Sequence, residues 1–399
     1  MSIAPVIRSD VPGSFSWSVF HERHPALVRR VLDARPYGAR ERAAVGRLLT
    51  ESTSGVVEPL PAGAEDGDRW AEWGRGLWGR PWGEVPFLWA ESYFYRRLLE
   101  ATGYFGEGAW RGIDPFAPFK EAELAGAGVD GELAALEGLR EAGRRRGEAL
   151  LASALWGNQA DLAFRSGGGD GGRGSAGLLV DDGPAFWAGL ERGRGGRVCL
   201  VADNAGPELL PDLVLIDELL GSGAAGRVSL YVKPHPYFVS DATMTDVLAA
   251  VERLRAASSG AAREAGGRLY GAMADGRLDV RTHPFFCAPL PYREMPADLR
   301  ADLGGATVTI LKGDLNYRRL VEDRYWPADT PFAGVAARFP TPVAALRTVK
   351  SEVVTGIGAA TTARLDAEEP GWRTSGRHAV VQVCGTSPSD YDTRSVSMI

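Results

Sequence analysis

Two oxygen-donor side chains, Asp203 and Asn204, stand directly beyond one predicted strand, and a third, Asp241, ends the polar segment 233–241 that follows a second. The strands are the apolar runs 197–202 and 227–232, and the segment between them carries apolar residues at helical spacing. A strand–helix–strand unit packs right-handed and parallel, so both strands end at the edge where open parallel sheets bind ligands. Carboxylate and amide oxygens suit a hard cation such as Mg²⁺ or Mn²⁺, which predicts a metal site. Helix caps and turns also favour Asp and Asn, and that alternative stays open for this pair viewed alone.

Basic and amide side chains follow two further predicted strands. Beyond 306–311, Lys312, Asn316 and Arg318 offer hydrogen-bond donors, and a helix beginning near Asp314 offers free backbone N–H groups. Beyond 342–347, Lys350 offers a point charge for phosphate oxygens. A charged helix start at the surface is the alternative interpretation. Together, an acidic metal site facing a basic phosphate site is what metal-assisted phosphoryl transfer requires.

The elements that position these residues form an α/β pattern. Strands and helices alternate from residue 197 onward, which predicts a three-layer α/β/α sandwich with a mainly parallel, Rossmann-like sheet. Further strands are predicted at 278–281 and 378–383, and helices at 206–221, 242–256, 260–274 and 314–322. The pattern divides the chain into an all-helical N-terminal subdomain, a glycine-rich linker, a metal- and phosphate-binding α/β/α domain and a mobile tail, at 1–165, 166–196, 197–385 and 386–399.

Composition excludes several classes of protein. The 399 residues are 45% hydrophobic, so the chain can bury a full core. A formal net charge of −6 without a basic stripe argues against a nucleic-acid partner. The three cysteines lack metal-type or disulfide-framework spacing. Neither a signal peptide nor an apolar run of about 20 residues is present, so we expect a cytoplasmic protein with no membrane partner.

Several segments together resemble the damage-control phosphatase family, a former domain of unknown function. They are DNAGPELLPDLVLIDELL, VKPHPYFVSD, LKGDLNYRRLVEDRYW and the RTVK of 347–350. The last marks the branch of acidic residue methyltransferase-like proteins, which carries an Arg-Thr-x-Lys motif. The resemblance spans about 20 to 385. The chain departs from the common pattern at Pro207, which replaces a bulky residue, and at Pro211.

The resemblance implies a metal-dependent phosphatase acting on a small phosphorylated substrate, such as fructose 1-phosphate or fructose 6-phosphate. It implies a divalent cation (Mn²⁺, Mg²⁺, Co²⁺ or Ni²⁺) held by Asp203, Asn204 and Asp241, which would also be the catalytic residues. The positions that match substrate contacts are Glu208, Asp314, Leu315, Asn316, Tyr317, Arg318 and Lys350.

Two other functions stay open at this point. One is an S-adenosylmethionine-dependent protein carboxyl methyltransferase, the activity after which this branch was once named. The turn after the first strand has Gly206 but not the several glycines that allow close approach of a cofactor. The other is a sugar-phosphate-binding protein without catalysis, against which the complete acid–amide–acid set argues.

Overall fold

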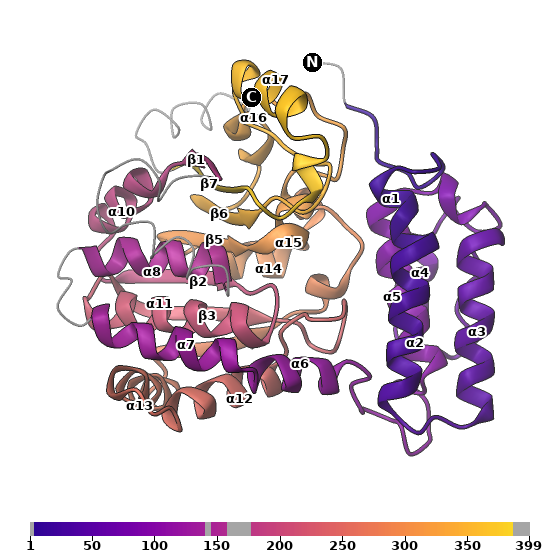
Figure 1. The fold of residues 1–399 in the computed structure, drawn as a ribbon, viewed down its shortest axis with the longest axis horizontal. Coiled ribbons are helices and arrows are strands. Elements are labelled where there is room, and N and C mark those ends of the chain that lie inside the picture. Colours follow the sequence, from indigo (N-terminus) through magenta and orange to yellow (C-terminus); the bar gives the residue numbers. More distant parts are fainter. Residues whose placement is uncertain (1–3, 140–144, 158–176, 386–399) are drawn as a thin grey trace.

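A seven-stranded sheet forms the centre of the α/β part of the molecule (Figure 1). The computed structural model describes residues 4–139, 145–157 and 177–385. The strand order is β1-β7-β6-β5-β2-β3-β4, and every neighbouring pair is parallel except β6 with β7. The strands are β1 Leu178–Asp181, β2 Gly196–Val201, β3 Ala225–Val232, β4 Leu278–Thr282, β5 Val308–Lys312, β6 Val343–Thr348 and β7 Ala379–Cys384. The six predicted strands are therefore confirmed, and β1 is an additional one.

Both faces of the sheet are buried because the central strands are apolar throughout. In β2, Val198 and Leu200 belong to one core cluster, whereas Cys199 and Val201 belong to the other. Successive side chains of a strand point to opposite faces, so each strand contributes to both clusters. Helices α7, α8, α10, α11, α12 and α13 supply the first cluster, and α14, α15, α16 and α17 pack into the second. The predicted three-layer α/β/α sandwich is confirmed.

The helices of the sandwich follow the strands in alternation. No helix of the described residues is both long enough and apolar enough to cross a membrane. The helices are α6 Ala117–Leu124, α7 Ala127–Ala135, α8 Arg145–Trp156, α10 Gly183–Arg192, α11 Leu209–Gly221, α12 Met244–Arg255, α13 Gly260–Ala274, α14 Ala297–Leu303, α15 Gly313–Leu320, α16 Phe332–Ala336 and α17 Ala359–Glu368.

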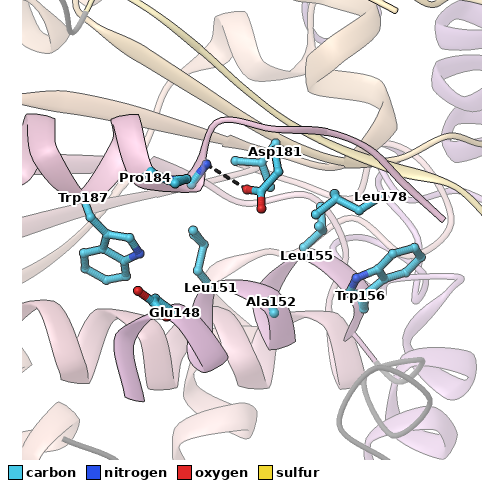
Figure 2. A pocket seen from close by; sticks show the side chains of 11 residues that line it. Glu148, Leu151, Ala152, Leu155, Trp156, Leu178, Asp181, Pro184 and Trp187 are labelled. Carbon is cyan, nitrogen blue, oxygen red and sulfur yellow. Dashed lines mark hydrogen bonds between the residues drawn. The ribbon is translucent and has the colours of Figure 1, made fainter. Parts of the chain in front are cut away.

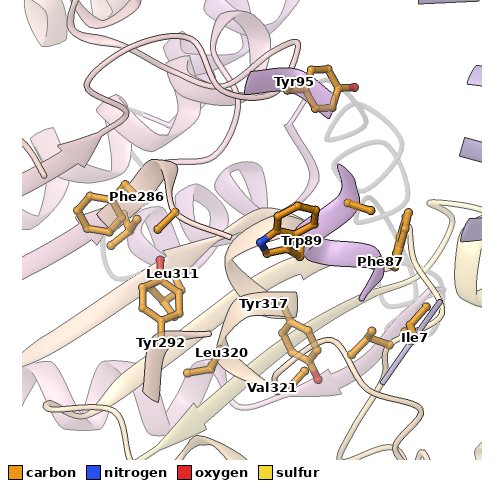
Figure 3. Close-up of a cluster of buried hydrophobic side chains, with 14 of the residues drawn as sticks. Ile7, Phe87, Trp89, Tyr95, Phe286, Tyr292, Leu311, Tyr317, Leu320 and Val321 are labelled. Carbon is orange, nitrogen blue, oxygen red and sulfur yellow. The ribbon is translucent and has the colours of Figure 1, made fainter. Parts of the chain in front are cut away.

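The first five helices stand beside the sandwich as a separate upright group (Figure 1). Their bounds are α1 Phe15–Ser18, α2 His24–Ala34, α3 Ala39–Ser54, α4 Gly67–Trp73 and α5 Phe87–Ala101. Helix α5 is buried along most of its length, and its Phe87 and Trp89 lie in the same apolar cluster as Tyr317 of α15 (Figure 3). Its Tyr95 stacks on Phe238, with ring centroids 4.6 Å apart. The helical group thus packs against the segments that follow the strands.

The structure differs from the predicted division of the chain in two places. Helices α6, α7 and α8 lie within the predicted helical subdomain, yet their apolar faces share a core cluster with α11 and the sheet. Within the predicted linker, 177–196 contains β1 and α10. The sequence does not predict β1, because it is a four-residue edge strand whose neighbour in the sheet is β7. The predicted glycine-rich stretch at 166–176 and the tail at 386–399 lie outside the described residues.

Candidate active site

The segments after β2 and β3 are joined by backbone hydrogen bonds that bring the three predicted metal ligands together. Asn204 and Asp241 form an isolated antiparallel bridge. The Ala242 N–H donates to the carbonyl oxygen of Asp203 at 2.9 Å, and the Ala205 N–H donates to that of Ser240 at 2.6 Å. These hydrogen bonds hold the two loops in a fixed register, although Asn204 and Asp241 are 37 residues apart in the sequence.

Each of the three side chains keeps an oxygen atom that no described residue occupies. Asn204 donates its Nδ2 to Glu208 Oε2 at 3.0 Å, which leaves its Oδ1 free. Asp241 Oδ2 accepts from the Phe238 N–H at 2.9 Å, which leaves Oδ1. Asp203 is only 7% exposed, and its Oδ1 is buried without a hydrogen-bond partner. A buried oxygen without a partner is costly unless a ligand satisfies it. The residues therefore fit a hard cation.

This donor set contains only two carboxylates, and the third ligand is an amide. No group of three or more His, Cys, Asp or Glu side chains in the described part of the chain is arranged to hold a metal ion. An acid–amide–acid set is consistent with that finding, since Asn204 supplies a carbonyl oxygen rather than a charge.

Gly313, the first residue of α15, makes room for the Asp203 carboxylate. Its φ is +78°, a conformation that L residues with side chains rarely adopt. A Cβ atom at this position would lie 1.8 Å from Asp203 Oδ2. The glycine therefore lets the backbone of α15 approach the proposed metal ligand directly.

The charges around Asp203 favour a bound cation. Burial raises the pKa of Asp203 well above its usual range, and the negative charges of Asp241 and Glu208 raise it further. The ammonium groups of Lys233 and Lys350 oppose this rise. Three carboxylates crowd one buried place, so a divalent cation there relieves the repulsion that otherwise favours protonation.

Glu208 and Lys350 form an ion pair next to the metal ligands. Glu208 belongs to the short helical turn Gly206–Glu208 before α11, and its Oε1 lies 3.2 Å from Lys350 Nζ. Burial alone raises the pKa of Glu208, but Lys350 and Lys312 together with the Asn204 amide lower it overall, so Glu208 stays ionised. The Lys350 side chain is 43% exposed, so its ammonium group is accessible to an incoming anion.

The predicted segment from Asp314 to Arg318 forms most of α15, and its side chains are largely occupied. Asp314 is held by Arg347 Nε at 2.7 Å and by the Ser351 hydroxyl at 3.1 Å. Burial raises its pKa, but Arg347 and Arg318 lower it overall, so it stays ionised. The N-cap residue of α15 makes no capping hydrogen bond with its side chain. The first backbone N–H groups of α15 therefore remain available beside Gly313.

Three other side chains of this segment hold the surrounding structure. The Asn316 amide donates to the carbonyl oxygens of Ala202 and Lys312 and accepts from the Tyr292 hydroxyl at 2.7 Å, which ties the ends of β2 and β5 together. Tyr317 hydrogen-bonds through its hydroxyl to Gln382 at 2.9 Å and to Thr355. Leu315 packs in a small apolar cluster with Leu88, Tyr237 and Cys287.

Two predicted phosphate donors, Arg318 and Lys312, are engaged elsewhere. Arg318 is 4% exposed and donates to Asp323 at 2.7 and 3.1 Å and to Glu91 at 2.7 Å. Lys312 points to the opposite face of the sheet, where it pairs with Asp212 at 2.7 Å and donates to the Ala154 carbonyl. Neither cation lies free beside the metal ligands.

Three residues at the site had no predicted role. Gly313 makes the close approach to Asp203. Lys120 of α6 pairs with Asp114 and Asp246, both at 2.7 Å, and donates to the Asp241 carbonyl at 3.4 Å. Lys233 directly follows β3 and is buried. Its position beyond a strand end is the same sequence signal that singled out Asp203.

A cavity elsewhere in the molecule does not coincide with this chemistry. It measures about 350 Å³ and lies between α8 and α10, lined by side chains such as Leu151, Trp156 and Trp187 (Figure 2). None of the predicted site residues lines it. Among the described residues that line it, the carboxylates are Glu148 and Asp181, and Asp181 accepts a hydrogen bond from the Gly183 N–H at 2.9 Å. We place the functional site by the convergent polar groups and not by this apolar cavity.

Comparison with known proteins decides the family. The family model described as the damage-control phosphatase ARMT1-like domain matches residues 19–365. The chain belongs to the ARMT1-like damage-control phosphatase family. The zebrafish (Danio rerio) damage-control phosphatase ARMT1 is 31% identical to this family member, covering 93% of this chain and 94% of that protein. The human (Homo sapiens) protein of the same name is 30% identical, covering 96% and 100%.

A solved structure of a DUF89 family protein from Pyrococcus horikoshii also aligns with this family member. It is 15% identical, with a TM-score of 0.47, over 92% of this chain and 97% of that one. Membership of the family makes this chain a damage-control phosphatase by class, with a small phosphorylated molecule as its kind of substrate.

Proposed function

We propose that this family member hydrolyses phosphate monoesters of small metabolites, with sugar phosphates such as fructose 1-phosphate and fructose 6-phosphate as its substrates. The observation that carries the proposal is the buried, unpartnered carboxylate of Asp203 beside the accessible ammonium group of Lys350. The Asp203 carboxylate can bind a cation, and the Lys350 ammonium group can bind an anion. Metal-assisted phosphoryl transfer needs both within one site.

Asp203, Asn204 and Asp241 would hold the divalent cation, which could be Mn²⁺, Mg²⁺, Co²⁺ or Ni²⁺. When bound, such a cation withdraws charge from a phosphoryl oxygen and lowers the pKa of a bound water. The Phe238 N–H donates to Oδ2 of Asp241, which leaves Oδ1 for the cation or for a water molecule. Asp241 would also orient the attacking water.

The remaining residues bind and orient the substrate. Lys350 neutralises phosphoryl oxygens, and it exchanges its contact with Glu208 for one with the substrate. The uncapped N–H groups at the start of α15 donate to the same anion. Once Lys350 contacts the substrate, Glu208 is free to accept hydrogen bonds from sugar hydroxyl groups. Asp314, Asn316 and Arg318 serve by fixing α15, since their side chains are held by buried partners.

The experiment is a phosphate-release screen over sugar phosphates and nucleotides, with and without Mn²⁺ or Co²⁺. We expect release from fructose phosphates that requires the metal and stops on chelation. Metal-independent release, or none from any phosphate monoester, would contradict the proposal. Titration with S-adenosylmethionine in a calorimeter tests the methyltransferase alternative, because tight binding without metal would favour it.

A further inference from the structure

Lysine is rare in this chain, and every lysine lies around the ends of the central strands. Of 45 basic residues only four are lysines. Three of them have carboxylate partners: Lys120 pairs with Asp114 and Asp246, Lys312 with Asp212, and Lys350 with Glu208. The fourth, Lys233, has no hydrogen-bond or ion-pair partner among the described residues. A chain that otherwise uses arginine thus keeps one unpaired lysine at this edge of the sheet.

Lys233 is firmly fixed and buried. Its residue is 1% exposed, and its Nζ is buried without a partner. Its backbone N–H donates to the Ala242 carbonyl at 2.9 Å, and it forms a parallel bridge with Thr243. Its Nζ lies over the ring of Tyr237, 6.0 Å from the ring centroid. The ammonium group therefore makes no direct hydrogen bond or ion pair with the described residues.

The register of the sheet places Lys233 and Asp203 on the same face. Val201 of β2 is paired with Tyr231 of β3, and beyond this pair Ala242 lies between the two segments, where its N–H donates to the Asp203 carbonyl and its carbonyl accepts from the Lys233 N–H. Because side chains alternate along each strand, Asp203 follows the face of Val201 and Lys233 follows the face of Tyr231. Val201 and Tyr231 belong to the core cluster on this face. Leu311 of β5 belongs to the same cluster, whereas Ile310 faces the other. Hence Lys312 faces away from Asp203, and Lys233 faces toward it.

Burying an ammonium group without a partner costs free energy, and a nearby divalent cation would repel that group as well. Only an anion that contacts both the cation and the ammonium removes this conflict. Lys233 lies close enough to Asp203 for its charge to act on that carboxyl group, but it makes no ion pair with it. A compact ammonium group also occupies less space than a guanidinium, which suits a confined place between two strand ends.

We propose that Lys233 is a substrate-binding residue whose ammonium group contacts a non-bridging oxygen of the phosphoryl group held at Asp203, Asn204 and Asp241. The inference rests on the proposed function and deepens it. Lys233 supplies the buried cation that was expected from Lys312 and Arg318. The product, inorganic phosphate, carries the same oxygens and therefore reports on the same contact.

The test compares Lys233→Met with Lys312→Met. Both changes remove a buried ammonium group. Lys312→Met leaves Asp212 without its ion-pair partner, whereas Lys233→Met deprives no residue of a partner. Three quantities are measured in the full chain: the melting temperature without ligand, the affinity for Mn²⁺, and the affinity of the Mg²⁺-loaded protein for inorganic phosphate by calorimetry. We expect Lys233→Met to melt no lower than the wild type, to bind Mn²⁺ at least as tightly, and to bind phosphate at least tenfold more weakly. Lys312→Met should melt lower.

The outcomes separate this inference from the proposed function. If the wild type turns over no phosphate ester but binds phosphate through Lys233, the inference holds and the catalytic proposal fails. If the wild type is an active phosphatase and Lys233→Met keeps its phosphate affinity, the catalytic proposal holds and the inference is wrong. A wild type that binds no phosphate overturns the inference, as does a Lys233→Met variant that melts lower and keeps its phosphate affinity.

Discussion

Replacing Gly313 by alanine tests whether the close approach of α15 to Asp203 matters. The added Cβ would lie 1.8 Å from Asp203 Oδ2, and ordinary contacts begin at 3.4 Å, so the carboxylate must retreat by about 1.6 Å. A misplacement of about 1 Å costs on the order of 100-fold in rate when it affects a reacting group. The positive φ of +78° adds about 1–2 kcal/mol of strain. We therefore expect Gly313→Ala to lose both Mn²⁺ affinity and at least about 99% of kcat/KM.

Gly276→Ala is the matched control. Gly276 has the same φ of +78°, and nothing lies within 4 Å of the position its Cβ would occupy. Gly276→Ala should lose about 1–2 kcal/mol of unfolding free energy in urea from backbone strain alone. Gly313→Ala should lose at least as much, because its Cβ would also overlap Asp203. Only Gly313→Ala should lose Mn²⁺ binding in a calorimetric titration. If Gly313→Ala binds Mn²⁺ and releases phosphate like Gly276→Ala, the placement of Asp203 against α15 has no functional importance and the reasoning is refuted.

Three further predictions concern charges inside the molecule. Arg318→Met leaves Glu91 and Asp323 buried without their partner, so the free energy of unfolding in urea should fall by about 3–5 kcal/mol; unchanged stability with a raised KM would show instead that Arg318 binds substrate. Lys350→Met should raise KM on the order of tenfold and leave Mn²⁺ affinity unchanged, as kinetics and calorimetry can decide. Burial, with help from Arg23, lowers the pKa of His24 to about 3. The unfolded chain therefore binds a proton that the folded chain rejects, and stability should fall by about 1.4 kcal/mol per pH unit below about 6.5, down to about 3. Urea unfolding of His24→Phe between pH 7.5 and 5 should show a shallower slope, and an identical slope would refute this assignment.

The strands and the meeting of the two loops follow from the sequence because local patterns decide them. Apolar runs ended by polar residues mark strand ends, and right-handed parallel connection brings those ends to one edge. The sequence alone therefore predicts that Asp203, Asn204 and Asp241 meet. The edge strand β1 is not predicted, because a run of four residues is too short to show a clear periodic pattern.

The direction of each basic side chain could not be predicted in the same way. Lys312 ends β5 and Lys233 follows β3, but only the register of the sheet tells which of them faces Asp203. Register depends on contacts between distant segments, and a shift of one residue exchanges the two faces. Likewise, Arg318 pairs with Glu91, which lies 227 residues earlier in the chain. Nothing local to Arg318 indicates that partner. The sequence groups helices α6 to α8 with the preceding helices for the same reason, since contacts such as that of α8 with α11 and of α6 with α12 join distant segments.

The most direct test of the proposed metal-dependent phosphatase is Asp203→Ala. Asp203 is buried without a hydrogen-bond partner for its Oδ1, so removing its carboxylate should not destabilise the fold. Phosphate release from fructose 1-phosphate is measured with Mn²⁺ for the wild type and the variant, beside their melting temperatures. We predict that the variant melts at or above the wild-type temperature and shows no metal-dependent release. A folded Asp203→Ala protein that still releases phosphate in a metal-dependent manner would contradict the assignment.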